Sequence, residues 1–226
     1  EARKEGCLHE MVILAAALSV QDPRERPLEQ EAAADQAHAA FRDPRSDFVG
    51  LLKIWKACWI DPTPNGSSSS PPSLPHLGSP PSDLRILPSV PSRSSVRGFC
   101  RKHFLSYRRM REWRDVYEEI LNILDEFGGF ALNGTPGGYD QIHRSIVSGY
   151  LSHIAMCKEK NIYLAARNRQ VMVFPGSGLF NRGGAWIVAS EMVQTSRLFA
   201  RIVASVEPEW LESLGSHLCR YTYFEP

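Results

Sequence analysis

The residues best placed to do chemistry in this chain are arginines between Asn161 and Ala204. Five arginines there face one acid, Glu191, and they are Arg167, Arg169, Arg182, Arg197 and Arg201. A guanidinium stays charged and donates paired N–H groups to phosphate, so such a set can hold an anionic backbone. On composition alone, a β-sandwich with solvated arginines explains the set equally well, and both interpretations stay open.

A second basic segment lies between Arg93 and Arg114, where eight Arg or Lys residues accompany one acid. The whole chain has a net charge of only +1, so positive charge is confined to these two segments, which indicates an anionic partner. Some of these arginines have a carboxylate four residues on, as in Arg114–Glu118, and we expect them to pair on a helix surface. Residues without such a partner are better candidates for phosphate contacts: Arg101, Lys102 and Arg109.

Other chemistries have little support in the sequence. The five cysteines are scattered, without a CxxC pair, which predicts reduced thiols in a cytosol-like compartment. Cys100 and His103 have no second pair to complete a zinc site, so we expect no metal. The loop at residues 134–138, GTPGG, is not followed by Lys-Ser/Thr and is therefore not a P-loop. We find no Ser/His/Asp set and no paired carboxylates on one face.

The arginines near the C-terminal end lie among short β-prone runs. These runs are Val171–Phe174, Trp186–Ser190 and Leu198–Val203, and turn residues separate them. Several short strands at this spacing predict a small closed or nearly closed β-barrel.

The remaining elements are predicted to be helical. Apolar residues recur at helical spacing in segments 7–20, 28–42, 47–59, 99–126 and 139–153, and Pro208 begins a last helix. Ser46 is the expected N-cap of the third segment. The last helix is expected to pack back onto the fold through its apolar residues, which are Trp210, Leu211, Leu214 and Leu218. Residues 11–20 are too short to span a bilayer, so no membrane partner is expected.

Residues 61–98 differ in composition, because 23 of these 38 residues are Pro, Ser or Gly. Such a segment buries too little apolar surface to offset its ordering entropy, so we predict a disordered insert. The predicted fold class is α+β. A helical domain at 1–60 and 99–153 is interrupted by this insert, and an OB-fold (oligonucleotide-binding) barrel with a C-terminal helix follows at 154–226.

Several long stretches together resemble the C-terminal region of DEAH-box RNA helicases, most closely those of the bacterial HrpA type. VFPGSGLFN, WIVASEMVQTSRLFARIV and VEPEWL are similar to the family's OB fold. GCLHEMVILAAALSVQDPRERP, SDFVGLLKIWKAC and FCRKHFLSYRRMREW are similar to its ratchet-like helicase-associated helices, and IHRSIVSGYLSHIAM to the helix that leads into the OB fold. The resemblance covers about residues 6–60 and 99–226.

The resemblance implies an accessory region that helps to enclose the strand pulled by two RecA-like motor domains. It implies single-stranded RNA contacts, mainly to the backbone, from Arg101, Lys102, Arg108, Arg109, Arg167, Arg169, Ser177 and Arg182. We expect the two basic patches to converge on one groove. Because the chain begins at Glu1 and carries no ATPase motif, we expect a piece of a longer protein that does not hydrolyse ATP alone.

Two functional hypotheses follow. In the first, the chain binds single-stranded RNA and couples it to the RecA-like motor domains, which would use ATP and Mg²⁺ while this piece needs no cofactor. In the second, it is a regulatory module that docks the motor or an activating protein. The expected location is the cytoplasm, or an organelle of bacterial descent in a eukaryote.

Overall fold

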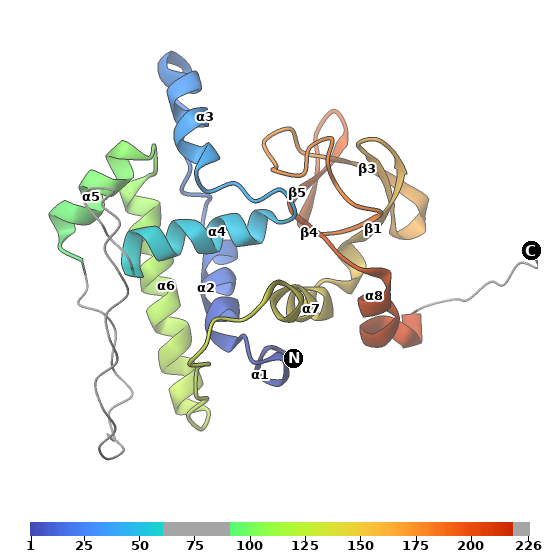
Figure 1. The fold of residues 1–226 in the computed structure, drawn as a ribbon, viewed down its shortest axis with the longest axis horizontal. Coiled ribbons are helices and arrows are strands. Elements are labelled where there is room, and N and C mark those ends of the chain that lie inside the picture. Colours follow the sequence, from blue (N-terminus) through green and yellow to red (C-terminus); the bar gives the residue numbers. More distant parts are fainter. Residues whose placement is uncertain (61–90, 219–226) are drawn as a thin grey trace, which may run out of the picture.

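The computed structural model describes residues 1–60 and 91–218 (Figure 1). Its α-helices are α1 (Ala2–Glu5), α2 (Leu8–Ser19), α3 (Glu31–Ala39), α4 (Asp47–Trp55), α5 (Arg93–Lys102), α6 (Tyr107–Glu126), α7 (Tyr139–Gly149) and α8 (Pro208–Gly215). Short 3₁₀ turns are η1 (Leu28–Gln30), η3 (Leu151–His153), η4 (Ala166–Asn168) and η5 (Ser216–Leu218), and a π-helical turn, η2 (Lys56–Ile60), extends α4.

The helical core forms where α2 packs against α6 and α4 crosses α2 (Figure 1). Trp55 on α4 packs against Trp113 and Tyr117 on α6, with ring centroids 5.1 and 4.7 Å apart. The indole Nε1 of Trp113 donates to the carbonyl oxygen of Ile13 on α2 at 2.9 Å, which satisfies its buried N–H. The aromatic stripe of residues 47–59 is therefore core, as its helical spacing indicates.

The barrel consists of β1 (Ile154–Glu159), β2 (Ile162–Ala165), β3 (Arg169–Val173), β4 (Trp186–Gln194) and β5 (Leu198–Ser205). The strands close in the order β1-β2-β3-β5-β4, with β3 and β5 parallel and the other pairs antiparallel. Buried side chains such as Tyr163, Val171 and Ile187 fill its interior. The α+β class and the small closed β-barrel predicted from the sequence are confirmed, and the barrel has five strands.

The barrel is joined to the helices through shared packing and backbone pairing. Val188 and Ala204 face outward from the barrel and belong to the helical core. Ser46 forms an isolated antiparallel bridge with Ala204, and the N–H of Ser205 donates to the carbonyl oxygen of Arg45 at 2.9 Å. The N-terminus of α4 is thus fixed to the end of β5.

The local predictions at α4 and α8 are confirmed. Ser46 Oγ accepts the N–H of Val49 at 3.2 Å as the N-cap of α4, and Pro208 is the first residue of α8. The prediction that Leu218 packs back was wrong, since its side chain is 66% exposed in the structure.

The predicted helix over residues 99–126 is two helices in the structure. α5 ends at Lys102 and α6 begins at Tyr107, with Phe104 between them at a φ of 52°. Residues 104–106 instead pair with the connector after α2: Glu25 N donates to Phe104 O at 2.9 Å, and Ser106 N donates to Pro23 O at 2.7 Å. This tertiary pairing overrides the helical pattern.

Two further differences concern the ends of elements. α5 already begins at Arg93, capped by Ser92 Oγ, so the last residues of the predicted disordered insert are helical. The rest of that insert, 61–90, lies outside the described residues. Strands β1 and β2 were not predicted: β1 ends in Lys158 and Glu159, and β2 has only four residues. None of the described helices combines the length and the apolar character that crossing a membrane requires.

Candidate nucleic-acid interface

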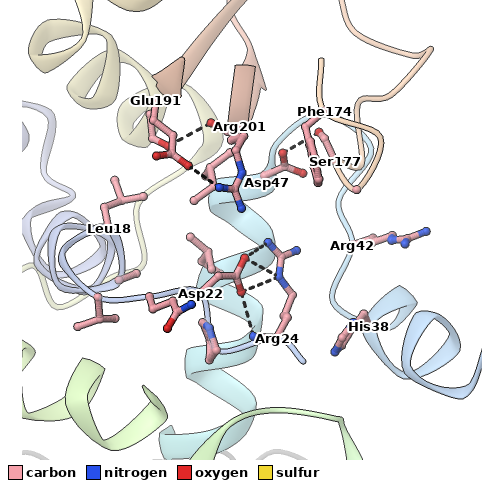
Figure 2. A pocket seen from close by; sticks show the side chains of 18 of the residues that line it. Leu18, Asp22, Arg24, His38, Arg42, Asp47, Phe174, Ser177, Glu191 and Arg201 are labelled. Carbon is pink, nitrogen blue, oxygen red and sulfur yellow. Dashed lines mark hydrogen bonds and ion pairs between the residues drawn. The ribbon is translucent and has the colours of Figure 1, made fainter. Parts of the chain in front are cut away.

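A groove of about 820 Å³ separates the helical part from the barrel. Its helical wall comes from the end of α2, the connector at residues 20–26, α3, α4 and one residue of α6. Its barrel wall comes from the turn at residues 174–177 and from β4 and β5. Figure 2 shows the charged side chains of both walls facing this space.

Asp47, the first residue of α4, ties the two walls together. Its carboxylate accepts three hydrogen bonds from the barrel: Ser177 Oγ at 2.6 Å, Gly178 N at 2.9 Å and Val203 N at 3.0 Å (Figure 2). A carboxylate at a helix N-terminus is also favoured by the helix dipole. Val203 follows Ile202, a β-branched residue at a φ of 49°, so the bond to Asp47 helps to hold a strained backbone in place.

On the helical wall, two of the four arginines, Arg24 and Arg26, are neutralised by close carboxylates. Arg24 meets Asp22 through both carboxylate oxygens, with Nη2 at 2.6 Å from Oδ2 and Nε at 3.0 Å from Oδ1. Burial alone would raise the pKa of Asp22, but the hydrogen bonds and charge of Arg24 outweigh it and hold the pKa below its usual value. Arg26 pairs with Asp35 at 2.9 Å and with Glu31 at 3.2 Å.

Two cations of the helical wall have no carboxylate partner within the described residues. Arg42 follows α3, is exposed, and has no ion pair through its guanidinium (Figure 2). Arg109 on α6 is half-buried, and its Nη1 donates to the carbonyl oxygen of Asp22 at 3.0 Å. That bond uses one of five N–H donors, so the guanidinium retains donors and a full charge for an anion.

On the barrel wall, Arg201 of β5 faces Glu191 of β4, its cross-strand neighbour in the antiparallel register. Arg201 Nη1 lies 3.2 Å from Glu191 Oε1, and both side chains are nearly half exposed. The guanidinium also lies 5.3 Å from the centre of the Phe174 ring, which is a cation–π contact. This wall therefore holds one loosely paired cation beside an exposed aromatic ring.

The structure brings two of the eight predicted strand-contacting residues into this groove, Arg109 and Ser177. The Ser177 hydroxyl that was expected to approach a phosphate donates to Asp47 and accepts the N–H of Leu179, so its proton is engaged in the fold.

The other six lie elsewhere. Arg101 and Lys102 are exposed in the last turn of α5, and Arg101 lines a shallow depression with Arg93 and Arg97. Arg108 is exposed and pairs with Glu112 at 3.0 Å. Exposed positions between β2 and β4 hold Arg167, Arg169 and Arg182.

The expected convergence of both basic patches on one groove is met only by Arg109 and Arg201, because the other predicted strand-contacting arginines and Lys102 do not line it. α5 and the barrel lie at opposite ends of the molecule, with α4 running between them (Figure 1). The physical reason is the pairing of residues 104–106 with the connector, which turns α5 away from the axis of α6. A role for these six residues in RNA binding stays a prediction.

The sequence interpretation missed most of the residues that define the groove. Asp22, Arg24 and Arg42 come from connectors whose partners are set by tertiary contacts. Glu191 and Arg201 were noticed only as charges, although their strand positions carried a usable signal, since cross-strand neighbours in an antiparallel pair lie face to face. In the part of the chain that the structure describes, no group of three His, Cys, Asp or Glu side chains could hold a metal ion.

Comparison with known proteins gives matches to both parts of the fold. Residues 142–218 match a family described as an oligonucleotide/oligosaccharide-binding (OB) fold, and residues 1–51 match the ratchet-like helicase-associated domain HA2.

Three curated relatives align with most or all of the chain. It is 38% identical over its whole length to the ATP-dependent RNA helicase HrpA of Escherichia coli, and 38% identical over 98% of its length to the HrpA homolog of Haemophilus influenzae. Over 91% of its length it is 26% identical to the pre-mRNA-splicing factor ATP-dependent RNA helicase prp22 of Schizosaccharomyces pombe. The chain spans 15% of the length of each of these relatives. It therefore belongs to the DEAH-box RNA helicase family, as the C-terminal accessory region that joins the helicase-associated ratchet domain to the OB fold in HrpA-type members.

Proposed function

We propose that this region binds single-stranded RNA in the groove between the ratchet helices and the barrel, mainly through phosphate contacts. In the longer protein it would couple the strand to RecA-like motor domains, which would supply ATP and Mg²⁺ chemistry. The observation that carries the proposal is a groove in which the guanidinium groups of Arg42 and Arg109 have no carboxylate partner within the described residues.

The charge balance of the groove sets the expected affinity. Most of its arginines are paired with acids, so only a few phosphates can be neutralised. Because each neutralised phosphate on a single strand contributes about −0.7 to the slope of log K against log salt, binding should be weak and moderately salt-dependent. We expect micromolar or weaker affinity for the region alone.

The test measures binding of a fluorescein-labelled twelve-nucleotide oligouridylate by anisotropy, at salt concentrations from about 50 to 200 mM. The double variant Arg42→Gln/Arg109→Gln should weaken binding roughly tenfold at the lower salt and reduce the salt slope by one to two. Arg3→Gln/Lys4→Gln on α1 removes the same charge outside the groove and should leave binding unchanged. Equal effects from both double variants, or no binding at low salt, would refute the proposal.

Four of the six predicted residues outside the groove are tested in the same assay. Arg101→Gln/Lys102→Gln removes two charges from α5, and Arg167→Gln/Arg169→Gln removes two charges from η4 and the first residue of β3. If the strand continues past the groove, each should weaken binding of a longer oligonucleotide more than of the twelve-nucleotide probe.

A specific observation favours a second candidate function, docking of a protein. The C-terminal end of α6 and the loop after it expose Phe127 (78%), Ile123 (44%) and Phe130 (36%). None of these residues lines the groove. A partner such as the motor domains would cover this apolar surface, so Phe127→Ser should weaken capture of the partner while leaving oligouridylate binding unchanged.

A further inference from the structure

Two of the ion pairs that line the groove, Arg24–Asp22 and Arg201–Glu191, differ in how firmly they hold their arginines. Asp22 grips Arg24 through both carboxylate oxygens, with contacts of 2.6 to 3.1 Å, and less than a third of each side chain is exposed. Glu191 meets Arg201 through one contact of 3.2 Å, and the two side chains are 49% and 44% exposed. Bidentate, buried pairs resist exchange, whereas a single exposed contact competes poorly with other anions.

Arg201 is held in place by more than Glu191. Its guanidinium lies over the ring of Phe174, and its backbone carbonyl accepts the hydroxyl of Ser190 at 3.1 Å. The ring itself is fixed by Phe199, which meets it edge-on at 6.0 Å. Gly176 lies in the same turn and packs closely against the Phe174 ring, because a Cβ added at Gly176 would lie 2.9 Å from it. The guanidinium therefore has a second neighbour, the Phe174 ring, besides the carboxylate of Glu191.

The surroundings of Arg201 suit a nucleotide unit. A phosphate can accept two parallel N–H···O bonds from a guanidinium. Glu191 contacts Arg201 through only one carboxylate oxygen, so this paired arrangement is not used in the structure. Phe174 is 40% exposed beside it and offers an aromatic surface for a base. Glu191 and Arg201 both line the groove, so a strand lying there would reach this position.

We propose that Arg201 is the phosphate-binding residue of the barrel wall, and that the carboxylate of Glu191 occupies its guanidinium until a phosphate displaces it. The inference rests on the proposed function and assigns it a further site, with Phe174 as the adjacent stacking surface. Glu191 then lowers the affinity of the groove, and the strand exchanges one anion for another when it binds.

The experiment compares the chain with Glu191→Gln, Arg201→Gln and the double variant, using the labelled twelve-nucleotide oligouridylate. Glu191→Gln should raise affinity about three- to tenfold and steepen the salt slope by about 0.7, which is one additional phosphate. Arg201→Gln should weaken binding a few-fold. In the Arg201→Gln background, the Glu191→Gln change should raise affinity by less than half of its effect in the parent chain.

The matched control is Glu159→Gln on β1, which removes one carboxylate from the barrel outside the groove. It should leave affinity unchanged. If Glu159→Gln raises affinity as much as Glu191→Gln, the effect is general charge and the inference is overturned. The inference also fails if Glu191→Gln acts equally with and without Arg201. Thermal unfolding of each variant verifies that these exposed positions leave the fold intact.

Two outcomes separate this inference from the proposed function. If Arg42→Gln/Arg109→Gln weakens binding but neither Glu191→Gln nor Arg201→Gln alters it, the groove binds RNA and Arg201 does not. If no oligouridylate binds at low salt, the proposed function itself fails. A labelled octaglutamate peptide is the third probe: binding tighter than oligouridylate, and lost in Arg201→Gln, would assign Arg201 to an acidic protein segment and overturn the inference.

Discussion

The ion pairs on the two walls of the groove hold their arginines in different ways. On the helical wall, Arg24 and Arg26 are each held by carboxylates, and Arg24 is largely buried with Asp22. On the barrel wall, Arg201 has one exposed contact and an aromatic ring beneath it. A high density of arginine is therefore a poor guide to an anion site, because pairing and burial decide which guanidinium groups are available.

The largest expected effect comes from uncoupling the two walls. Asp47→Ala leaves three barrel donors without their acceptor, and hydrogen bonds to a charged group contribute about 1.5–3 kcal/mol each, non-additively. We expect the free energy of unfolding to fall by about 3–4 kcal/mol, measured by urea denaturation. Asp35→Ala, which removes an exposed partner of Arg26, should lower the free energy of unfolding far less, because exposed pairs contribute little. Similar losses in both variants would contradict the role of Asp47.

Acid should weaken the same junction through His143 on α7. Ser46 Oγ lies 2.7 Å from His143 Nε2, and His143 Nδ1 lies 2.7 Å from the carbonyl oxygen of Tyr139. Because that carbonyl can only accept, Nδ1 carries the proton and Nε2 accepts from Ser46. Burial lowers the pKa of His143 from 6.5 to about 4, so the native state keeps the ring neutral.

The contribution of neutral His143 to the free energy of unfolding is fully present above pH 6.5, its pKa in the unfolded chain. This contribution is lost as the pH falls toward 4, its pKa in the native state. Between pH 7.5 and 5 we expect a loss of about 2 kcal/mol from this group, since the unfolded chain binds the proton and the native state does not. Urea denaturation at both pH values measures the loss. His143→Gln should flatten the pH dependence in this range, and an unchanged slope would show that other groups cause it.

The tight ion pair of the helical wall should be more sensitive to neutralisation than the loose pair of the barrel wall. Asp22→Asn leaves Arg24 largely buried without its counter-charge, which should cost about 1–2 kcal/mol of unfolding free energy. The measurement is thermal or urea unfolding in parallel with the parent chain. A cost near zero would show that water replaces the carboxylate at Arg24.

The smallest effect is expected at the loose pair. Glu191→Gln should change the free energy of unfolding by less than about 0.5 kcal/mol, because exposed pairs contribute little. The same unfolding assay measures it. A loss as large as that of Asp22→Asn would remove the distinction between the two walls.

Local sequence patterns predicted the elements that carry their own signal. Ser46 caps α4, Pro208 begins α8, and three of the five strands follow apolar runs. Residues 103–106 were predicted as helix because their pattern is helical, but the Phe104 carbonyl and the Ser106 N–H bond to Glu25 and Pro23. Partners 80 residues away in sequence are set by the packing of the whole fold, which a local pattern does not contain.

The candidate site was less predictable than the fold. The family resemblance indicated a strand-binding region, and the basic residues of the chain were visible as charges. Which of them are available depends on neighbours such as Asp22 and Glu191, whose distance to an arginine is a tertiary property. Ser177 illustrates the limit, because the family resemblance implied a hydroxyl that approaches a phosphate, whereas in the structure this hydroxyl donates to Asp47.

The fastening of α4 to the barrel has a mechanical consequence. Separating the barrel from the helices would break three bonds to one carboxylate together with the backbone pairing of residues 45–46 with residues 204–205. We expect these contacts to keep the width of the groove nearly constant. A force applied to either half would be transmitted to the other as a rigid displacement, without opening the space between them.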